Sequence, residues 1–75
     1  GIPGTDYYTD DRLVEFKYFK AKDAEKVLAL DAPLADHVDQ VHRYADDTLR
    51  RFPNYHVRTY VVYICANRGW KCWEV

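Results

Sequence analysis

Glu15 and Lys17 are the residues of this chain whose types and spacing best suit chemistry. They stand two apart in a run of β-branched and aromatic residues, so on a strand both side chains leave the same face. Leu13 and Phe19 share that face, and an ordinary solvated face seldom holds a charged pair between apolar neighbours. A carboxylate beside an ammonium can bind a divalent cation and stabilise an oxyanion or orient water. The alternative is a same-face ion pair on a partly exposed strand.

A second acid, Asp6, comes close to Glu15 if a hairpin precedes the strand. Three consecutive elements are expected there: a short strand at 6–8, a turn at 9–11 and a strand over Arg12–Phe19. A turn centred on its two aspartates puts Asp6 opposite Glu15, with Cβ atoms roughly 4.5–5.5 Å apart. Two opposed carboxylates repel unless a cation such as Mg²⁺ lies between them. A register shifted by one residue turns Asp6 to the other face, and Asp6 as a turn-flanking acid is the alternative.

Gln40 and Tyr44 form a second polar pair, on a long helix predicted over Leu34–Phe52. An apolar stripe at helical spacing defines this helix: Leu34, Val38, Val41, Ala45, Leu49 and Phe52. Gln40 and Tyr44 stand four apart on a flank beside the stripe, where polar groups can reach the edge of a site on a sheet. The alternative is two helix-flank residues whose polar ends lie in solvent.

The remaining elements complete an α/β (α+β) domain with the order β-β-α-α-β-β. They are a short helix over Lys22–Leu30, a strand over His56–Ala66 that is apolar on both faces from Val61, a turn at Asn67–Gly69 and a strand over Trp70–Val75. We expect a mixed central sheet with Arg12–Phe19 and His56–Ala66 as inner strands. The long helix should pack across it through Val38, Val41, Ala45 and Leu49.

Composition bounds the class of protein. The 75 residues suffice for one domain, and an aromatic content of 16% excludes a disordered tail. A net charge of −1 gives no support for a polyanion partner. Cys65 and Cys72 are too few for a disulfide scaffold. No apolar run approaches the roughly 20 residues of a membrane span. We therefore expect a cytoplasmic protein with reduced thiols. Because the chain contains no Met, we expect it to be a piece of a longer protein.

The motifs together resemble a known family. An acidic residue, then Glu-x-Lys after an apolar lead (Leu13-Val14-Glu15-Phe16-Lys17), then Gln-x-x-x-Tyr on a following helix is similar to the PD-(D/E)XK nuclease superfamily. The similarity is closest to RecB-like members and to nuclease-like domains found C-terminal to AAA-ATPase-like modules in bacteria. It runs from about Asp6 to Val75. The resemblance implies a restriction-endonuclease-like core over residues 1–75, a C-terminal fragment that lacks the usual N-terminal helix.

The resemblance also implies an activity, that of a Mg²⁺-dependent phosphodiester hydrolase acting on DNA or RNA. Asp6 and Glu15 would hold Mg²⁺ or Mn²⁺, with the Phe16 backbone carbonyl as a further ligand. Lys17 would position the attacking water and offset charge at the scissile phosphate.

Gln40 and Tyr44 would contact the site or the nucleic-acid backbone. The alternative function is a non-catalytic binding or dimerisation module that retains the nuclease fold, and activity of the fragment itself is open. A domain this small and rich in Tyr and Trp should leave an apolar surface uncovered, so we expect a homodimer and no membrane partner.

Overall fold

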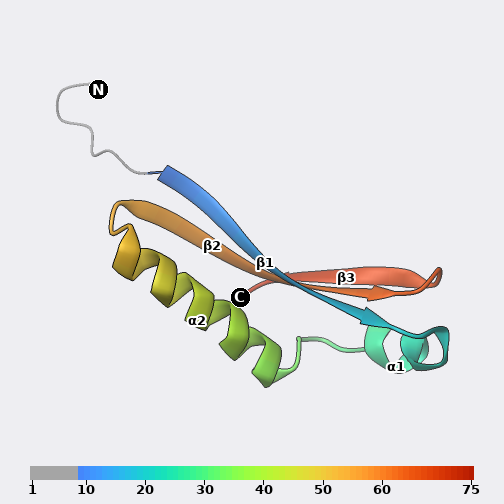
Figure 1. Ribbon diagram of the computed structural model, residues 1–75. Coiled ribbons are helices and arrows are strands. Elements are labelled where there is room, and N and C mark those ends of the chain that lie inside the picture. The colour runs from blue at the N-terminus through green and yellow to red at the C-terminus, as the bar shows by residue number, and fades with distance from the viewer. Residues whose placement is uncertain (1–8) are drawn as a thin grey trace.

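A three-stranded mixed sheet with helices on one face makes up the described part of the chain, residues 9–75 of the computed structural model (Figure 1). Its elements are β1 (Thr9–Phe19), a 3₁₀ turn (Ala21–Asp23), α1 (Ala24–Leu28), α2 (Ala35–Arg51), β2 (Tyr55–Cys65) and β3 (Gly69–Glu74). The predicted α+β class and mixed sheet are confirmed. The strand expected at 6–8 lies outside the described residues.

The sheet has the order β1-β2-β3, with β2 in the centre. β1 runs parallel to β2 along its whole length, and β3 pairs with β2 antiparallel after a tight turn. Parallel neighbours need a long crossover, which α1 and α2 supply. The prediction of β2 as an inner strand is confirmed. The same prediction for β1 is wrong within residues 9–75, where β1 forms an edge.

The turn predicted at residues 9–11 is also wrong, because these residues belong to β1. Thr9, Asp10 and Asp11 pair with Tyr55, His56 and Val57 of β2. Long-range pairing therefore outweighs the local turn preference of the two aspartates. The hairpin that would have set Asp6 opposite Glu15 has no turn at this point, and Asp6 itself lies outside the described residues.

The helix α2 packs on β1 and β2 through the predicted stripe. Val41 is 1% exposed, and Val38 and Ala45 are half-buried. Leu49 remains 38% exposed, so the contact fades toward the C-terminal end of the helix. The bounds Ala35–Arg51 lie one residue inside the predicted ones at each end. The short helix is shorter than predicted, because a 3₁₀ turn replaces its first residues and it ends at Leu28.

The core lies between the sheet and the helices, and Tyr63 of β2 is its largest fully buried side chain. The rings of Phe19, Trp73 and His37 surround it edge-to-face, with centroids 4.9, 5.1 and 5.4 Å away. Edge-to-face pairs of this kind stabilise a core beyond simple burial. The β2–β3 turn comes one residue earlier than predicted, and Gly69 opens β3 with a φ of 148°. A side chain would be strained at that φ.

Candidate active site

Glu15 and Lys17 lie on the face of β1 that the helices cover. Exposure alternates along β1, and Leu13 and Phe19 on the same face pack against the core. Lys17 Nζ lies 3.3 Å from Glu15 Oε1, and the two side chains are 33% and 14% exposed. The predicted same-face pair is thus confirmed as an ion pair at the border of the core. A pair of this kind adds at most about 1 kcal/mol when its role is only structural.

The carboxylate of Glu15 is a hard anionic oxygen donor of the kind that Mg²⁺ prefers. Residues 9–75 contain no group of three or more His, Cys, Asp or Glu side chains able to hold a metal. Asp11 shares the face but stands four residues away, about 13 Å along a strand, and accepts a hydrogen bond from the Arg12 amide. The donor chemistry therefore fits a metal at Glu15, while the described residues provide one carboxylate there. Asp6, the other proposed ligand, lies outside them.

Gln40 and Tyr44 lie on α2 and share a hollow of about 230 Å³ with Arg43. Gln40 is half-buried and Tyr44 is 55% exposed. Arg43 Nε points back to the Asp39 carbonyl oxygen at 3.5 Å, and its terminal nitrogens have no protein partner within residues 9–75. All three side chains present hydrogen-bond donors, and the guanidinium suits phosphate oxygens.

The candidate residues form two separate groups on neighbouring elements. Glu15 and Lys17 lie on β1, and Gln40 and Tyr44 lie on α2. The helix α2 packs on the sheet face that carries Glu15 and Lys17. Over the part of the chain that the structure describes, no hydrogen bond or ion pair joins these two to Gln40 or Tyr44. A ligand long enough to touch both groups would bridge them.

Tyr63 and His37 are neighbours of this site that no motif predicted. Tyr63 pairs with Lys17 in the β1–β2 register. Its hydroxyl accepts a hydrogen bond of 2.8 Å from the Leu34 amide and lies 2.5 Å from His37 Nδ1. A signal was present in the sequence, since a tyrosine in an apolar central strand needs a partner for its hydroxyl. The helical position of that partner is set only by packing.

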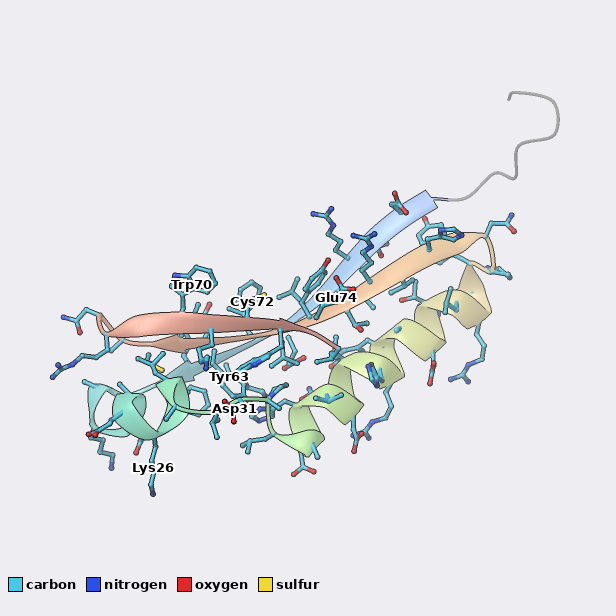
Figure 2. All side chains as sticks on the ribbon, turned by 180° about the vertical axis from the view of Figure 1, so that it is seen from behind. Lys26, Asp31, Tyr63, Trp70, Cys72 and Glu74 are labelled. Carbon is cyan, nitrogen blue, oxygen red and sulfur yellow. The ribbon has the colours of Figure 1, made fainter. Side chains whose placement is uncertain are left out.

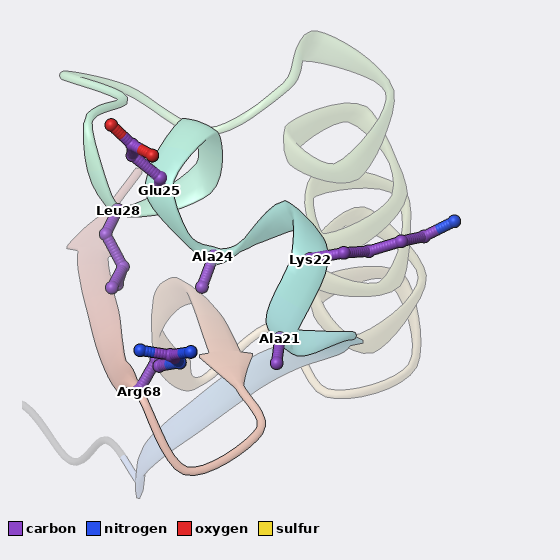
Figure 3. Close-up of a pocket in the computed structure, with 6 residues that line it drawn as sticks. All are labelled: Ala21, Lys22, Ala24, Glu25, Leu28 and Arg68. Carbon is purple, nitrogen blue, oxygen red and sulfur yellow. The ribbon is translucent and has the colours of Figure 1, made fainter.

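A hollow elsewhere, between α1 and the β2–β3 turn, is no competing active site (Figure 3). It has a volume of about 310 Å³, and Lys22, Glu25 and Arg68 are its charged residues. In Figure 3 Lys22 points away from Arg68, and Glu25 points away from both. Ligand sites have polar groups that converge, and these do not.

The comparisons with known proteins agree with the motifs. A family model of the PD-(D/E)XK nuclease superfamily matches residues 2–74, nearly the whole chain. No curated protein and no solved structure matches it. Within residues 9–75, no helix is long and apolar enough to cross a membrane. The predicted resemblance to the PD-(D/E)XK nuclease superfamily is confirmed, and this chain belongs to that superfamily.

Proposed function

We propose that this domain is a divalent-metal-dependent phosphodiesterase acting on nucleic acid, with Glu15 and Lys17 at the centre of its active site. The observation that carries the proposal is the 3.3 Å pair of Lys17 Nζ and Glu15 Oε1 on the helix-covered face of β1. It is supported by membership of the nuclease superfamily, whose Glu-x-Lys motif these residues match.

In this proposal Glu15 and Asp6 hold Mg²⁺ or Mn²⁺, with the Phe16 carbonyl oxygen as a further ligand. The metal, when bound, polarises the phosphate and lowers the pKa of a bound water toward neutrality. Lys17 Nζ donates hydrogen bonds from a position beside the Glu15 carboxylate. From there it orients the attacking water and offsets negative charge that develops on the phosphate.

The hollow lined by Gln40, Arg43 and Tyr44 binds a backbone phosphate next to the scissile one in this proposal. The Gln40 amide and Tyr44 hydroxyl add neutral donors to the guanidinium, which together match a phosphate better than one charge alone. Such a contact orients the nucleic acid without selecting a base sequence.

A second candidate function is a non-catalytic binding module that retains the fold. The observation in its favour is the single carboxylate that residues 9–75 place at Glu15, with no metal-binding cluster among them. In that case Glu15 and Lys17 form only an ion pair, and their loss costs similar small amounts of stability.

Thermal melts with and without Mg²⁺ or Mn²⁺ separate the two functions. Metal that binds the native state raises the melting temperature, and the rise should disappear in Glu15→Gln and Asp6→Asn. Glu25→Gln, an exposed glutamate of α1, is the matched control and should retain it. Lys17→Ala should retain or enlarge the rise, because a positive charge beside the metal is removed, yet it should lower cleavage of an oligonucleotide. Equal metal-induced shifts in wild type and Glu15→Gln would exclude the proposed site.

A further inference from the structure

His37 lies beside the candidate active site, and the proposed function gives it no part. Its Nδ1 atom lies 2.5 Å from the Tyr63 hydroxyl, and the two rings meet edge-to-face at 87° with centroids 5.4 Å apart. Tyr63 is fully buried, whereas His37 is half-buried in the first turn of α2. One edge of the imidazole is therefore fixed against the core, and the other edge is turned away from Tyr63.

The strand register places this contact next to Lys17. Tyr63 is the β2 partner of Lys17, and the side chains of paired residues in adjacent strands leave the same face, about 4.8 Å apart at the backbone. Figure 2 shows Tyr63 on the side of the sheet that carries α1 and α2, and Trp70 on the other side. Because His37 contacts the tip of Tyr63, it lies one side chain away from Lys17 and its ion pair with Glu15.

His37 also shares a flank of α2 with Gln40 and Tyr44. The three residues follow each other at intervals of three and four, so they form one row along the helix. The chain between the parallel strands β1 and β2 passes through α2, and such connections are right-handed in nearly all proteins. With that hand, and with Val41 facing the sheet, the row lies on the β1 side of α2. The row therefore runs from the hollow at Gln40 and Tyr44 toward Lys17.

The segment that leads into α2 is held on the sheet by side chains of β2 and β3. Lys71 Nζ donates a hydrogen bond of 2.5 Å to the Leu30 carbonyl oxygen. Trp73 Nε1 donates one of 3.0 Å to the Asp31 carbonyl oxygen. Together with Tyr63, these contacts fix the position from which the first turn of α2 starts. A side chain held in this way needs little rearrangement to act on a bound substrate.

The Nε2 atom of His37 is available to a substrate. It has no hydrogen-bond partner within residues 9–75. The two nitrogens of an imidazole point away from each other, so Nε2 is directed away from the Tyr63 hydroxyl that Nδ1 contacts. When this hydroxyl donates to Nδ1, the hydrogen of the neutral ring is on Nε2. The contact with Tyr63 thus favours a histidine that presents a donor outward.

We propose that His37 is a general acid of the phosphodiesterase reaction and donates its Nε2 hydrogen to the ester oxygen that leaves phosphorus. This inference rests on the proposed function, in which Lys17 orients the attacking water. As the water oxygen bonds to phosphorus, the bond to the leaving oxygen breaks with its electron pair on that oxygen, which takes the proton from Nε2. The attacking water releases a proton to solvent, and the half-buried ring regains one from solvent. A positioned general acid accelerates such a step by about 10²–10⁴-fold.

A leaving group that needs no proton tests this role. In an oligonucleotide with one bridging phosphorothiolate, sulfur replaces the leaving oxygen, 3′ or 5′ as analysis of the wild-type products shows. Thiols have a pKa of about 8.5, so a thiolate leaves without being protonated. With Mn²⁺ and the oxygen substrate, His37→Asn should lower kcat by about 100-fold or more. With the sulfur substrate the same variant should lower kcat by less than about 3-fold.

The choice of variants separates this role from support of the fold. Asparagine places its amide where Nδ1 of histidine lies, so His37→Asn keeps a partner for the Tyr63 hydroxyl, and its melting temperature should stay close to that of the wild type. His37→Gln places an amide near the position of Nε2, where it can donate a hydrogen bond but no proton, so it should also be slow on the oxygen substrate. His42→Asn is the matched control, because His42 is exposed on the same helix, and it should cleave both substrates like the wild type.

The remaining outcomes overturn the inference. Equal losses on both substrates in His37→Asn would mean a contact without proton transfer, and wild-type rates on both would leave His37 only its contact with Tyr63. A nitrogen NMR spectrum that places the hydrogen of the neutral ring on Nδ1 also overturns it. Cleavage that is lost in Glu15→Gln but retained in His37→Asn keeps the proposed function and overturns only this inference. If the wild type cleaves neither substrate, the proposed function fails, and the inference fails with it.

Discussion

The hydroxyl group of Tyr63 lies 2.5 Å from Nδ1 of His37, in the first turn of α2. The same hydroxyl accepts the Leu34 amide hydrogen, and the Tyr63 side chain has no exposed surface. The hydroxyl and Nδ1 share one hydrogen bond, and the tautomer of the His37 ring sets which of the two donates. One buried hydroxyl thereby fixes the start of α2 over β2.

Replacing this hydroxyl should destabilise the domain. Tyr63→Phe keeps the ring but leaves the Leu34 amide and His37 Nδ1 without a partner, which we expect to lower the free energy of unfolding by about 1–3 kcal/mol. Tyr55→Phe is the matched control, because Tyr55 stacks on Phe52 and its hydroxyl has no protein partner in the described chain. It should change stability by less than about 0.5 kcal/mol. Urea denaturation measures the free energy of unfolding of both variants, provided that their m-values equal that of the wild type. Equal losses of stability in Tyr63→Phe and Tyr55→Phe would contradict the role assigned to the Tyr63 hydroxyl.

Elements with a strong local pattern could be predicted from the sequence. The stripe from Leu34 to Phe52 predicted α2 to within one residue at each end, because its spacing matches a helix and Val41 fills the core. Alternation along β1 placed Glu15 and Lys17 on one face, since strand geometry alone decides that. Gln40 and Tyr44 could be predicted to lie on one flank of α2 for the same reason, because they stand four apart within one helix.

Features that depend on pairing between distant segments could not be predicted. Asp10 and Asp11 carry turn chemistry, yet parallel pairing with β2 holds them in a strand. The parallel pairing of β1 with β2 depends on a crossover of more than thirty residues that no local window contains. The contact between Tyr63 and His37 spans 26 residues and depends on where α2 settles on the sheet. The placement of Asp6 opposite Glu15 depended on the turn that was wrongly predicted at residues 9–11, so the role of Asp6 as a metal ligand stays a prediction.

The packing of α2 predicts that truncating the smaller of two side chains on the apolar stripe destabilises the domain more than truncating the larger one. Val41 is 1% exposed, whereas Leu49 on the same stripe is 38% exposed. Val41→Ala should therefore cost about 2 kcal/mol of stability, through lost burial and the cavity left behind. Leu49→Ala removes more atoms but should cost less than about 1 kcal/mol, because solvent already reaches them. Chemical denaturation measures the free energy of unfolding of both variants. A larger loss of this free energy for Leu49→Ala than for Val41→Ala would contradict the observed packing of the helix on the sheet.

The last prediction concerns oligonucleotide binding at the hollow on α2, and it rests on the proposed contact of this hollow with a backbone phosphate. Arg43→Gln removes the one charge among Gln40, Arg43 and Tyr44, so binding of an oligonucleotide should weaken by a similar factor for every base sequence. The slope of log binding constant against log salt concentration should fall by about 1. Fluorescence anisotropy in the presence of a metal chelator measures this without cleavage.

Arg50→Gln is the control for that measurement, because Arg50 is exposed on the same helix and takes no part in the hollow. If both arginines reduced affinity and salt slope equally, the effect would come from net charge, and the hollow would have no special part in it. If only Arg43→Gln did so, the phosphate would have to lie over Gln40 and Tyr44, on the helix that packs on β1, the strand of Glu15 and Lys17. The nucleic acid would then run along α2 toward the helix-covered side of β1, where the carboxylate and the ammonium lie together.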